Sequence, residues 1–293
     1  IMNLISKLPG PLLVFLGALS LSFGGLIVKS FEGANLWQIL FWRSIFFILV
    51  VSIFLTITYR KNVLKAFVKS GFPGLIGGLI LSTGFCGYVF AMYNTTVANT
   101  NFIIQTQTIF LAVFGYLFLK EKVSKITLVS FILAISGIIL MVGSSLSPGQ
   151  MSGNIAAFIM PISFAILILI IRKYPNVDMV PLQLIAGIVA MIIGYLFAGK
   201  ILISLYDVYL GFLAGFFQLG FGFILITIGA RRTPSALVGI IMLTEAVLGP
   251  LWAWLFANEQ PPLIVLIGGS IVIISVLLQF LPILQKNKTL LKS

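Results

Sequence analysis

One carboxylate stands in the middle of an apolar run, where an ionisable group is costly. Glu245 lies in IIMLTEAVLGPLWAWLF (residues 240–256), ten residues after Ser235. At about 1.5 Å per residue it is about 15 Å along a helix. An acidic side chain there costs about 2.5–3.5 kcal/mol in a membrane, so it normally faces a cavity or a partner. Glu245 is therefore a candidate for binding a solute or a coupling proton. The alternative is a protonated side chain that only bonds a neighbouring helix.

A second polar pattern lies in the segment NFIIQTQTIF, which is otherwise apolar. Asn101, Gln105 and Thr108 follow i, i+4 and i+7 spacing, which places them on one helix face. Gln107, beside them, is the neutral analogue of Glu245 in the repeat described below. This face is expected to line a solute cavity. Hydrogen bonding between helices, worth about 0.6 kcal/mol per bond, is the alternative.

Aromatic and basic residues supply further candidates for solute contact. Trp252 follows Glu245 by seven residues and returns to nearly the same helix face, where its ring would suit an ammonium group. It could equally be an aromatic at the membrane interface. Arg43 lies within an apolar run and either snorkels outward, lines the outer vestibule or pairs with a carboxylate. Further candidates, each of which could instead serve packing, are Tyr88, Gln218 and Phe223.

The composition indicates an integral membrane protein. The chain is 60% hydrophobic and 8% charged, whereas soluble domains carry about 25% charged residues. It has no histidine and one cysteine, Cys86, so no metal site or cofactor is expected. Acid/base pairs are missing at membrane depth, so the chain is not expected to be an enzyme. Its basic residues form no single patch for nucleic acid, and no nucleotide-binding loop points to ATP.

Ten runs are long and apolar enough to cross a hydrocarbon core of about 30 Å as helices. Short connections rich in Pro, Gly, Asn or charge separate them. No run alternates with a period of two, so the expected fold is an all-α bundle of ten transmembrane helices. Pro161 and Pro250 fall inside two of the runs and are expected to kink them. The runs are 11–29, 35–58, 71–93, 99–118, 125–143, 152–171, 179–199, 206–228, 235–256 and 261–284.

The basic residues predict the orientation of these spans. With both termini in the cytoplasm, 15 of the 18 Lys and Arg residues fall on the cytoplasmic side. Such a bias sets membrane topology. The cytoplasmic residues are Lys7, Arg60, Lys61, Lys65, Lys69, Lys120, Lys122, Lys125, Arg172, Lys173, Arg231, Arg232, Lys286, Lys288 and Lys292.

The chain also resembles itself at a separation of 138 residues. YLFLKEK, which contains Glu121, aligns with WLFANEQ, which contains Glu259, and Gln107 aligns with Glu245. Residues 1–145 and 146–293 are therefore predicted to be five-helix repeats of one transmembrane domain. Five spans separate the copies, so the second repeat is inverted. Inverted repeats are typical of transporters with a substrate site near the midplane.

These features together resemble the drug/metabolite transporter superfamily, EamA type. The resemblance rests on the ten spans, the inverted repeats and the motifs FWRSIF, LKEK and ANEQPP. It implies a secondary transporter, often an exporter of amino acids or related metabolites, with a central cavity between the repeats. It does not name the solute.

The sequence thus predicts a transporter that exports or exchanges a small metabolite by alternating access. An amino acid or a related zwitterionic or cationic solute fits the single carboxylate at membrane depth. The alternative is a broad efflux pump for organic cations or drugs. The inner (plasma) membrane is the expected location, the lipid bilayer is the expected partner, and a homodimer is left open. Glu121 and Glu259 lie in turns, where they are expected to cap or tether helix ends.

Overall fold

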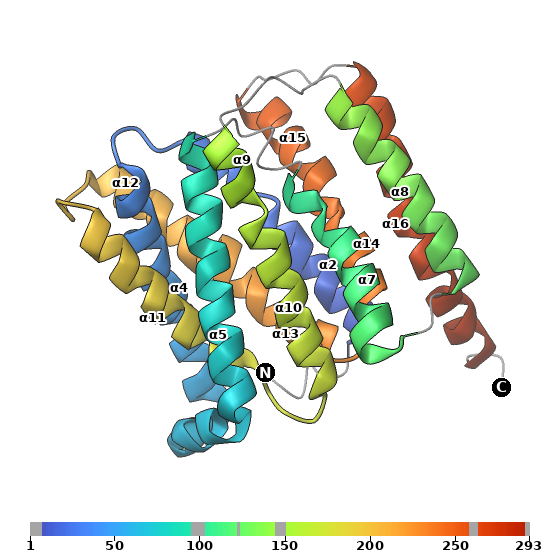
Figure 1. The fold of residues 1–293 in the computed structure, drawn as a ribbon, viewed down its shortest axis with the longest axis horizontal. Coiled ribbons are helices and arrows are strands. Elements are labelled where there is room, and N and C mark those ends of the chain that lie inside the picture. The colour runs from blue at the N-terminus through green and yellow to red at the C-terminus, as the bar shows by residue number, and fades with distance from the viewer. Residues whose placement is uncertain (1–7, 95–102, 122–123, 144–150, 258–262, 291–293) are drawn as a thin grey trace.

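The computed structural model describes residues 8–94, 103–121, 124–143, 151–257 and 263–290, and within them it is helical without strands (Figure 1). The first half contains α2 (Gly10–Leu21), α3 (Gly24–Lys29), α4 (Leu36–Tyr59), the short 3₁₀ helix η1 (Arg60–Asn62), α5 (Val63–Asn94), α7 (Gln107–Leu119) and α8 (Lys125–Gly143). The second half contains α9 (Met151–Ala157), α10 (Ile159–Lys173), α11 (Val180–Phe197), α12 (Leu205–Phe212), the π-helix η2 (Leu213–Phe221), α13 (Gly222–Ala230), α14 (Ser235–Met242), α15 (Thr244–Ala257) and α16 (Leu263–Leu290). The predicted all-α class is confirmed.

Six helical stretches of the described chain are long and apolar enough to cross a membrane. One of them, Leu36–Ala91, has 56 residues, which is about twice the length that one crossing needs. It contains α4 and α5, and the chain turns between them where Arg60 has a φ of 50°. Shorter apolar helices cover 103–119, 125–137 and 266–275. Every predicted run overlaps a helix, while ten crossings and the cytoplasmic termini stay predictions.

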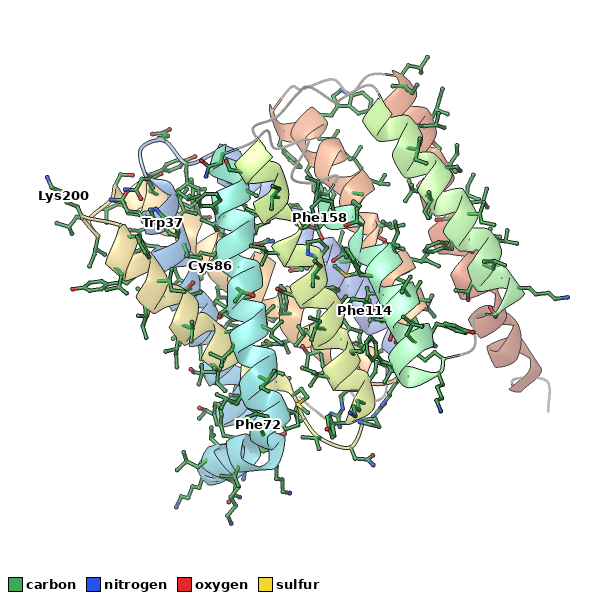
Figure 2. The ribbon with its side chains drawn as sticks, viewed as in Figure 1. Trp37, Phe72, Cys86, Phe114, Phe158 and Lys200 are labelled. Atoms are coloured by element: carbon green, nitrogen blue, oxygen red, sulfur yellow. The ribbon has the colours of Figure 1, made fainter. Side chains whose placement is uncertain are left out.

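Side chains at the start of α4 bond the free backbone N–H groups of that helix and also join it to the end of α11. The Asn35 side chain accepts hydrogen bonds from the Trp37 and Gln38 backbone N–H groups, as an N-cap does. Asn35 Nδ2 donates to the Ala198 carbonyl at 3.2 Å, and Gln38 Nε2 donates to the Lys200 carbonyl at 2.7 Å. Trp37 and Lys200 accordingly lie at the same end of the bundle in Figure 2.

The closest helix pairs follow the 138-residue repeat. Helices from equivalent spans of the two halves pack on each other: α4 on α11, α8 on α16, and α7 on α14, which precedes α15, the helix that aligns with α7. Other contacts occur twice, once in each orientation of the repeat. The span of α2 matches that of α10 and the span of α5 matches that of α13, and α2 packs on α13 while α10 packs on α5. In Figure 1, α8 and α16 stand together at one edge of the bundle.

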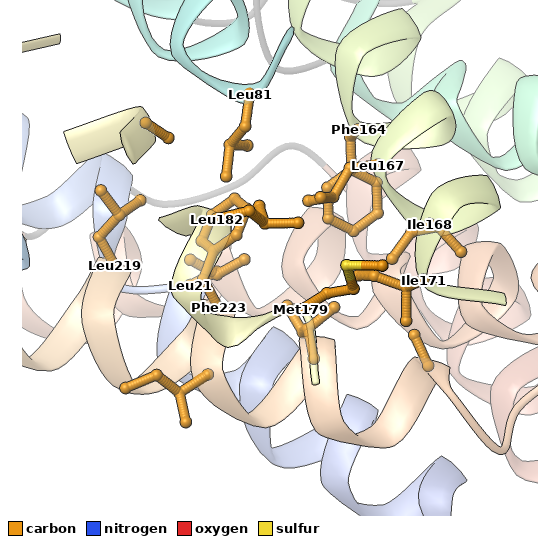
Figure 3. Close-up of a cluster of buried hydrophobic side chains, with 14 of the residues drawn as sticks. Leu21, Leu81, Phe164, Leu167, Ile168, Ile171, Met179, Leu182, Leu219 and Phe223 are labelled. Carbon is orange, nitrogen blue, oxygen red and sulfur yellow. The ribbon is translucent and has the colours of Figure 1, made fainter. Parts of the chain in front are cut away.

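Aromatic rings from both halves form the centre of the apolar core. The Phe223 ring lies edge-on to Phe47, Phe85 and Phe164, with centroids 5.4 to 6.3 Å apart. Figure 3 shows Phe164 and Phe223 among aliphatic side chains from four other helices and the loop before α11. Phe223 is fully buried. Its place in the structure is therefore helix packing.

Glycines allow the closest helix approaches. A Cβ added at Gly78 of α5 would lie 2.7 Å from the Leu182 carbonyl oxygen of α11, and one at Gly215 of η2 would lie 2.2 Å from the Arg43 carbonyl oxygen of α4. Backbones pack this closely in membranes when the interface residues are small. The Gly-rich runs thus bring helices together.

We expect Gly215→Ala to lower the free energy of unfolding by about 1–3 kcal/mol, because the new methyl group meets backbone that cannot move aside. The matched control is Gly25→Ala in α3, where an added Cβ meets nothing within 4 Å. That change should be neutral or slightly stabilising. Unfolding of both variants in detergent, followed by circular dichroism, makes the comparison. Equal stabilities would contradict the packing described here.

Candidate functional site

Two helical stretches of the described chain, 103–119 and 235–257, are interrupted by the same kind of turn. In one, the Thr106 N–H bonds the Ile103 carbonyl and the Ile109 N–H bonds the Thr106 carbonyl. In the other, the Leu243 N–H bonds the Ile240 carbonyl and the Ala246 N–H bonds the Leu243 carbonyl. Each is an i→i−3 pattern, which tightens the helix locally. The two breaks are 137 residues apart, within one residue of the repeat.

Glu245 and Gln107 occupy matching places at these breaks. Gln107 is the first residue of α7, and Glu245 is the second residue of α15. The amino end of a helix carries partial positive charge, which favours an acidic side chain in its first turn. Glu245 is half-buried, and its carboxylate makes no ion pair or hydrogen bond with the described residues. Glu245 thus lies at the start of a helix with no basic partner among the described residues.

Arg43 is buried against aromatic rings. Only 4% of its surface is exposed, and its guanidinium carbon lies 5.6 Å from the Phe85 ring centroid and 5.5 Å from the Tyr88 ring centroid. Both distances are within the range of a cation–π contact. Its Nε has no hydrogen-bond partner among the described residues. The guanidinium therefore points inward and does not snorkel to the membrane surface.

Tyr88 packs against Arg43, whose guanidinium carbon lies 5.5 Å from its ring centroid. Tyr88 is also close enough to Glu245 to experience its charge, but no ion pair joins Arg43 to Glu245 in the described part of the chain. Arg43 is seven residues into α4 and Glu245 is ten residues past the start of α14, which begins at the opposite end of the bundle. We call Arg43, Tyr88 and Glu245 the central charged cluster. Its two charged residues come from different repeats.

Several buried polar atoms near the two breaks lack partners among the described residues. They are both amide atoms of Gln107, Oε1 of Gln105 and Oγ1 of Thr244. Gln107 is 1% exposed and Gln105 is 6% exposed. Native proteins pair most buried polar atoms, so a group of unpaired ones marks a place where a polar ligand can bind.

The other polar candidates have protein partners. Thr108 Oγ1 donates to the Gly239 carbonyl at 3.1 Å, joining α7 to α14. Gln218 Nε2 donates to the Leu21 carbonyl at 3.2 Å, where α2 ends. Trp252 Nε1 donates to Ser22 Oγ at 2.8 Å. Asn101 lies outside the described residues.

The contacts of Gln218 and Trp252 meet at a third break, between α2 and α3. Ser22 and Phe23 separate the two helices, and the Phe23 and Trp252 rings are stacked with centroids 4.7 Å apart. Gln218, which bonds Leu21, belongs to the π-helix η2. Inside a membrane a broken helix needs neighbouring side chains to satisfy its free backbone groups. Gln218 and Trp252 therefore hold this break in shape.

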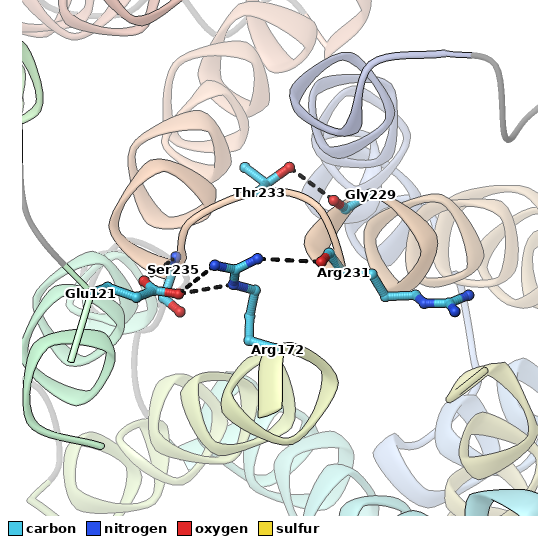
Figure 4. Close-up of polar contacts among 6 residues, drawn as sticks. All are labelled: Glu121, Arg172, Gly229, Arg231, Thr233 and Ser235. Carbon is cyan, nitrogen blue, oxygen red and sulfur yellow. Dashed lines mark hydrogen bonds and ion pairs between the residues drawn. The ribbon is translucent and has the colours of Figure 1, made fainter. Parts of the chain in front are cut away.

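A polar network closes the bundle at the end where α7 stops and α14 begins (Figure 4). Glu121 pairs with Arg172 of α10 at 2.8 Å, and its other oxygen accepts from the Ser235 backbone N–H at 2.8 Å. Arg172 also donates to the Arg231 carbonyl at 3.2 Å. The prediction that Glu121 caps and tethers helix ends is confirmed. Glu259 lies outside the described residues.

The members of the central charged cluster were each identified from the sequence, which also offered Glu245 as a possible partner of Arg43. The structure breaks the helix at Leu243, seven residues before Pro250, and α15 includes Pro250, so the kink expected at Pro250 stays a prediction. The π-helix and the contact of Trp252 with Ser22 were not predicted. A hydrophobic run carries no spacing signal for either feature.

Comparisons with known proteins agree with this architecture. The model of the EamA-like transporter family matches twice, at residues 8–143 and 149–281. A solved structure titled "Crystal structure of protein" has a TM-score of 0.77 with 15% sequence identity, and the match covers 92% of this chain and 96% of that chain. At this identity the likeness concerns the fold alone. No curated protein matches the chain.

We expect Glu121→Ala to lower the free energy of unfolding by about 1–3 kcal/mol, because it removes a charged partner of Arg172 and the cap of Ser235. The pair is partly exposed, with side chains 21% and 13% accessible, so the loss should fall below that of a fully buried pair. Glu32→Ala is the control, since this side chain is exposed. Thermal unfolding in detergent tests this. An unchanged midpoint for Glu121→Ala would show that the network does not stabilise the fold.

Proposed function

Because the chain belongs to the EamA-like transporter family and is a multi-pass membrane transporter, we propose that it moves small zwitterionic metabolites, amino acids among them. The central charged cluster is the observation that carries the proposal. It offers one cation from the first repeat, one carboxylate from the second, and unpaired polar atoms beside both helix breaks. In transporters of this plan the substrate site lies near the midplane, where the repeats meet.

Arg43 needs a counter-charge, and the solute is proposed to bring it. A buried charge without a partner is strongly unfavourable. Glu245 is the one carboxylate that the sequence places at membrane depth, and it does not pair with Arg43 in the described chain. A substrate carboxylate would accept two parallel hydrogen bonds from the planar guanidinium. We therefore propose that Arg43 binds the carboxylate of the solute.

Glu245 supplies the second half of the recognition. A carboxylate attracts the ammonium group of the same solute, and the Tyr88 ring lies within electrostatic range. The α4 helix of 24 residues is about 36 Å long. Arg43 lies about 10 Å from one end and Glu245 about 15 Å from the other, which leaves about 10 Å between them along the bundle. Arginine and glutamate side chains are long enough to meet a small zwitterion across that separation.

The same geometry disfavours the alternative, an efflux pump for organic cations. Such a solute would gain from Glu245 but would meet the Arg43 guanidinium as a like charge. In surroundings of low dielectric constant that repulsion is larger than in water. Trp252, the aromatic candidate for an ammonium contact, is already bonded to Ser22 and stacked on Phe23.

Alternating access follows from the two repeats. We take residues 1–145 and 146–293 as inverted copies, as the matched helix contacts support. The Glu121 network joins α7 of one half to α10 and α14 of the other, so it would close the cytoplasmic end of the predicted topology. Its opening would then accompany solute release or entry on that side, by export or exchange across the inner membrane.

Counterflow in proteoliposomes tests the assignment. Labelled leucine and its decarboxylated analogue isoamylamine are compared for the wild type, Arg43→Gln and Glu245→Gln. We expect Arg43→Gln to lower leucine counterflow at least tenfold without lowering amine counterflow, since a hydrogen bond to a charged group contributes about 1.5–3 kcal/mol. Glu245→Gln should lower both. Leucine stands here for small neutral amino acids.

Matched controls are Lys200→Gln and Glu32→Gln, whose side chains are exposed and should leave both fluxes unchanged. Circular dichroism of each variant confirms folding. Transport of the amine but not of leucine by the wild type would overturn the proposal in favour of the cation pump. Leucine flux that is unaffected by Arg43→Gln would remove the arginine from the substrate site.

The same variants test whether Glu245 carries a coupling proton. Counterflow needs no net proton movement, whereas accumulation driven by a pH gradient does. If Glu245 binds the ammonium group, Glu245→Gln lowers both activities. Retained counterflow with lost accumulation would instead assign the carboxylate to proton coupling.

A further inference from the structure

The amino-terminal end of α5 has an unusual exposed surface, far from the central charged cluster. The chain leaves α4 at Arg60, with a φ of 50°, and turns again at Gly71, with a φ of 55°. Between them, residues 63–70 form a short helical segment, which the non-helical torsions of Gly71 set at an angle to the rest of α5. Figure 1 shows it turned out of the line of α5, and Figure 2 labels Phe72 there. We call residues 60–72 the elbow segment.

The outer face of the elbow segment is strongly apolar. Leu64 is 80% exposed, Val68 is 79% exposed and Phe72 is 72% exposed. Their spacing of four residues places Leu64 and Val68 on one side of the short helix. Ala66 and Ser70 are buried on the opposite side. The segment therefore rests on the bundle by its small residues and presents its large ones outward.

Basic residues lie beside this apolar face. Lys61, Lys65 and Lys69 follow the same spacing of four residues, and Arg60 precedes them. All four are exposed. The elbow segment contains no acidic residue. A helix with lysines next to large apolar side chains is typical of segments that lie in the membrane interface and attract anionic lipids.

The equivalent connection of the other repeat provides a comparison within the chain. Leu202, between α11 and α12, and Leu205, the first residue of α12, are each 89% exposed, so exposed apolar side chains occur at both connections. Only Lys200 is basic there. The predicted topology places that connection outside and the elbow segment in the cytoplasm, the side with the anionic leaflet. Apolar exposure is thus common to both connections, while the cluster of positive charge belongs to one.

We propose that the elbow segment binds the headgroups of anionic phospholipids while Leu64, Val68 and Phe72 enter the acyl region. The four cations meet the lipid phosphates, and their alkyl stems cover the apolar surface beneath. Charge complementarity selects anionic lipid over a neutral one. This site is independent of the solute proposed above.

Fluorescence quenching tests the proposal on the full chain. A probe is attached at Leu64→Cys in a Cys86→Ser background, and the protein is reconstituted in phosphatidylcholine with about 20% brominated lipid. We expect brominated phosphatidylglycerol to quench the probe at least twofold more than brominated phosphatidylcholine. The preference should shrink at about 1 M salt, where the screening length falls to about 3 Å.

Two variants separate charge from apolar contact. Replacing Arg60, Lys61, Lys65 and Lys69 with Gln should equalise quenching by the two lipids without abolishing it. The same probe at Leu202→Cys, on the other connection, should show no lipid preference. Equal quenching at position 64 with the native charges would overturn the proposal, as would the absence of quenching by either lipid. A preference that survives the four substitutions would contradict the assignment to these residues.

Discussion

The centre of this bundle is arranged around a buried guanidinium that has no carboxylate partner among the described residues. Arg43 is 4% exposed and touches the faces of two aromatic rings. Cation–π contacts offset part of the cost of burial, at about 2 kcal/mol when desolvated. They do not replace the hydrogen bonds that a planar guanidinium makes to an anion. A solute carboxylate could accept these hydrogen bonds.

The breaks in two helices are the second feature that shapes this site. Regular helices satisfy all of their own backbone groups, so they offer a ligand only side chains. The breaks at Thr106 and Leu243 place Gln107 and Glu245 in the first turns of new helices. The amino end of a helix favours a carboxylate, and Glu245 makes no ion pair with the described residues. Charge and helix geometry therefore support each other at Glu245.

The sequence predicted the helical class, the repeat and the family because each depends on a pattern that extends over many residues. Runs of about 20 apolar residues, and an offset that holds across three helices, can be recognised even where single residues depart from the pattern. Glu245 and Arg43 were identified for a similar reason, since a charge in an apolar run is conspicuous. What was missed depends on contacts between distant helices. Trp252 meets Ser22, 230 residues away, and Thr108 meets Gly239, and no spacing within one helix encodes either pairing.

The proposed function depends on the recognition of a solute carboxylate by Arg43. Equilibrium binding of leucine and leucine methyl ester to the purified transporter, measured by isothermal titration calorimetry, tests it most directly, because the ester removes the negative charge and keeps the ammonium group and the side chain. We expect the wild type to bind leucine at least tenfold more tightly than the ester, and Arg43→Gln to bind the two alike. Equal affinities for the wild type, or a preference that Arg43→Gln retains, would contradict it.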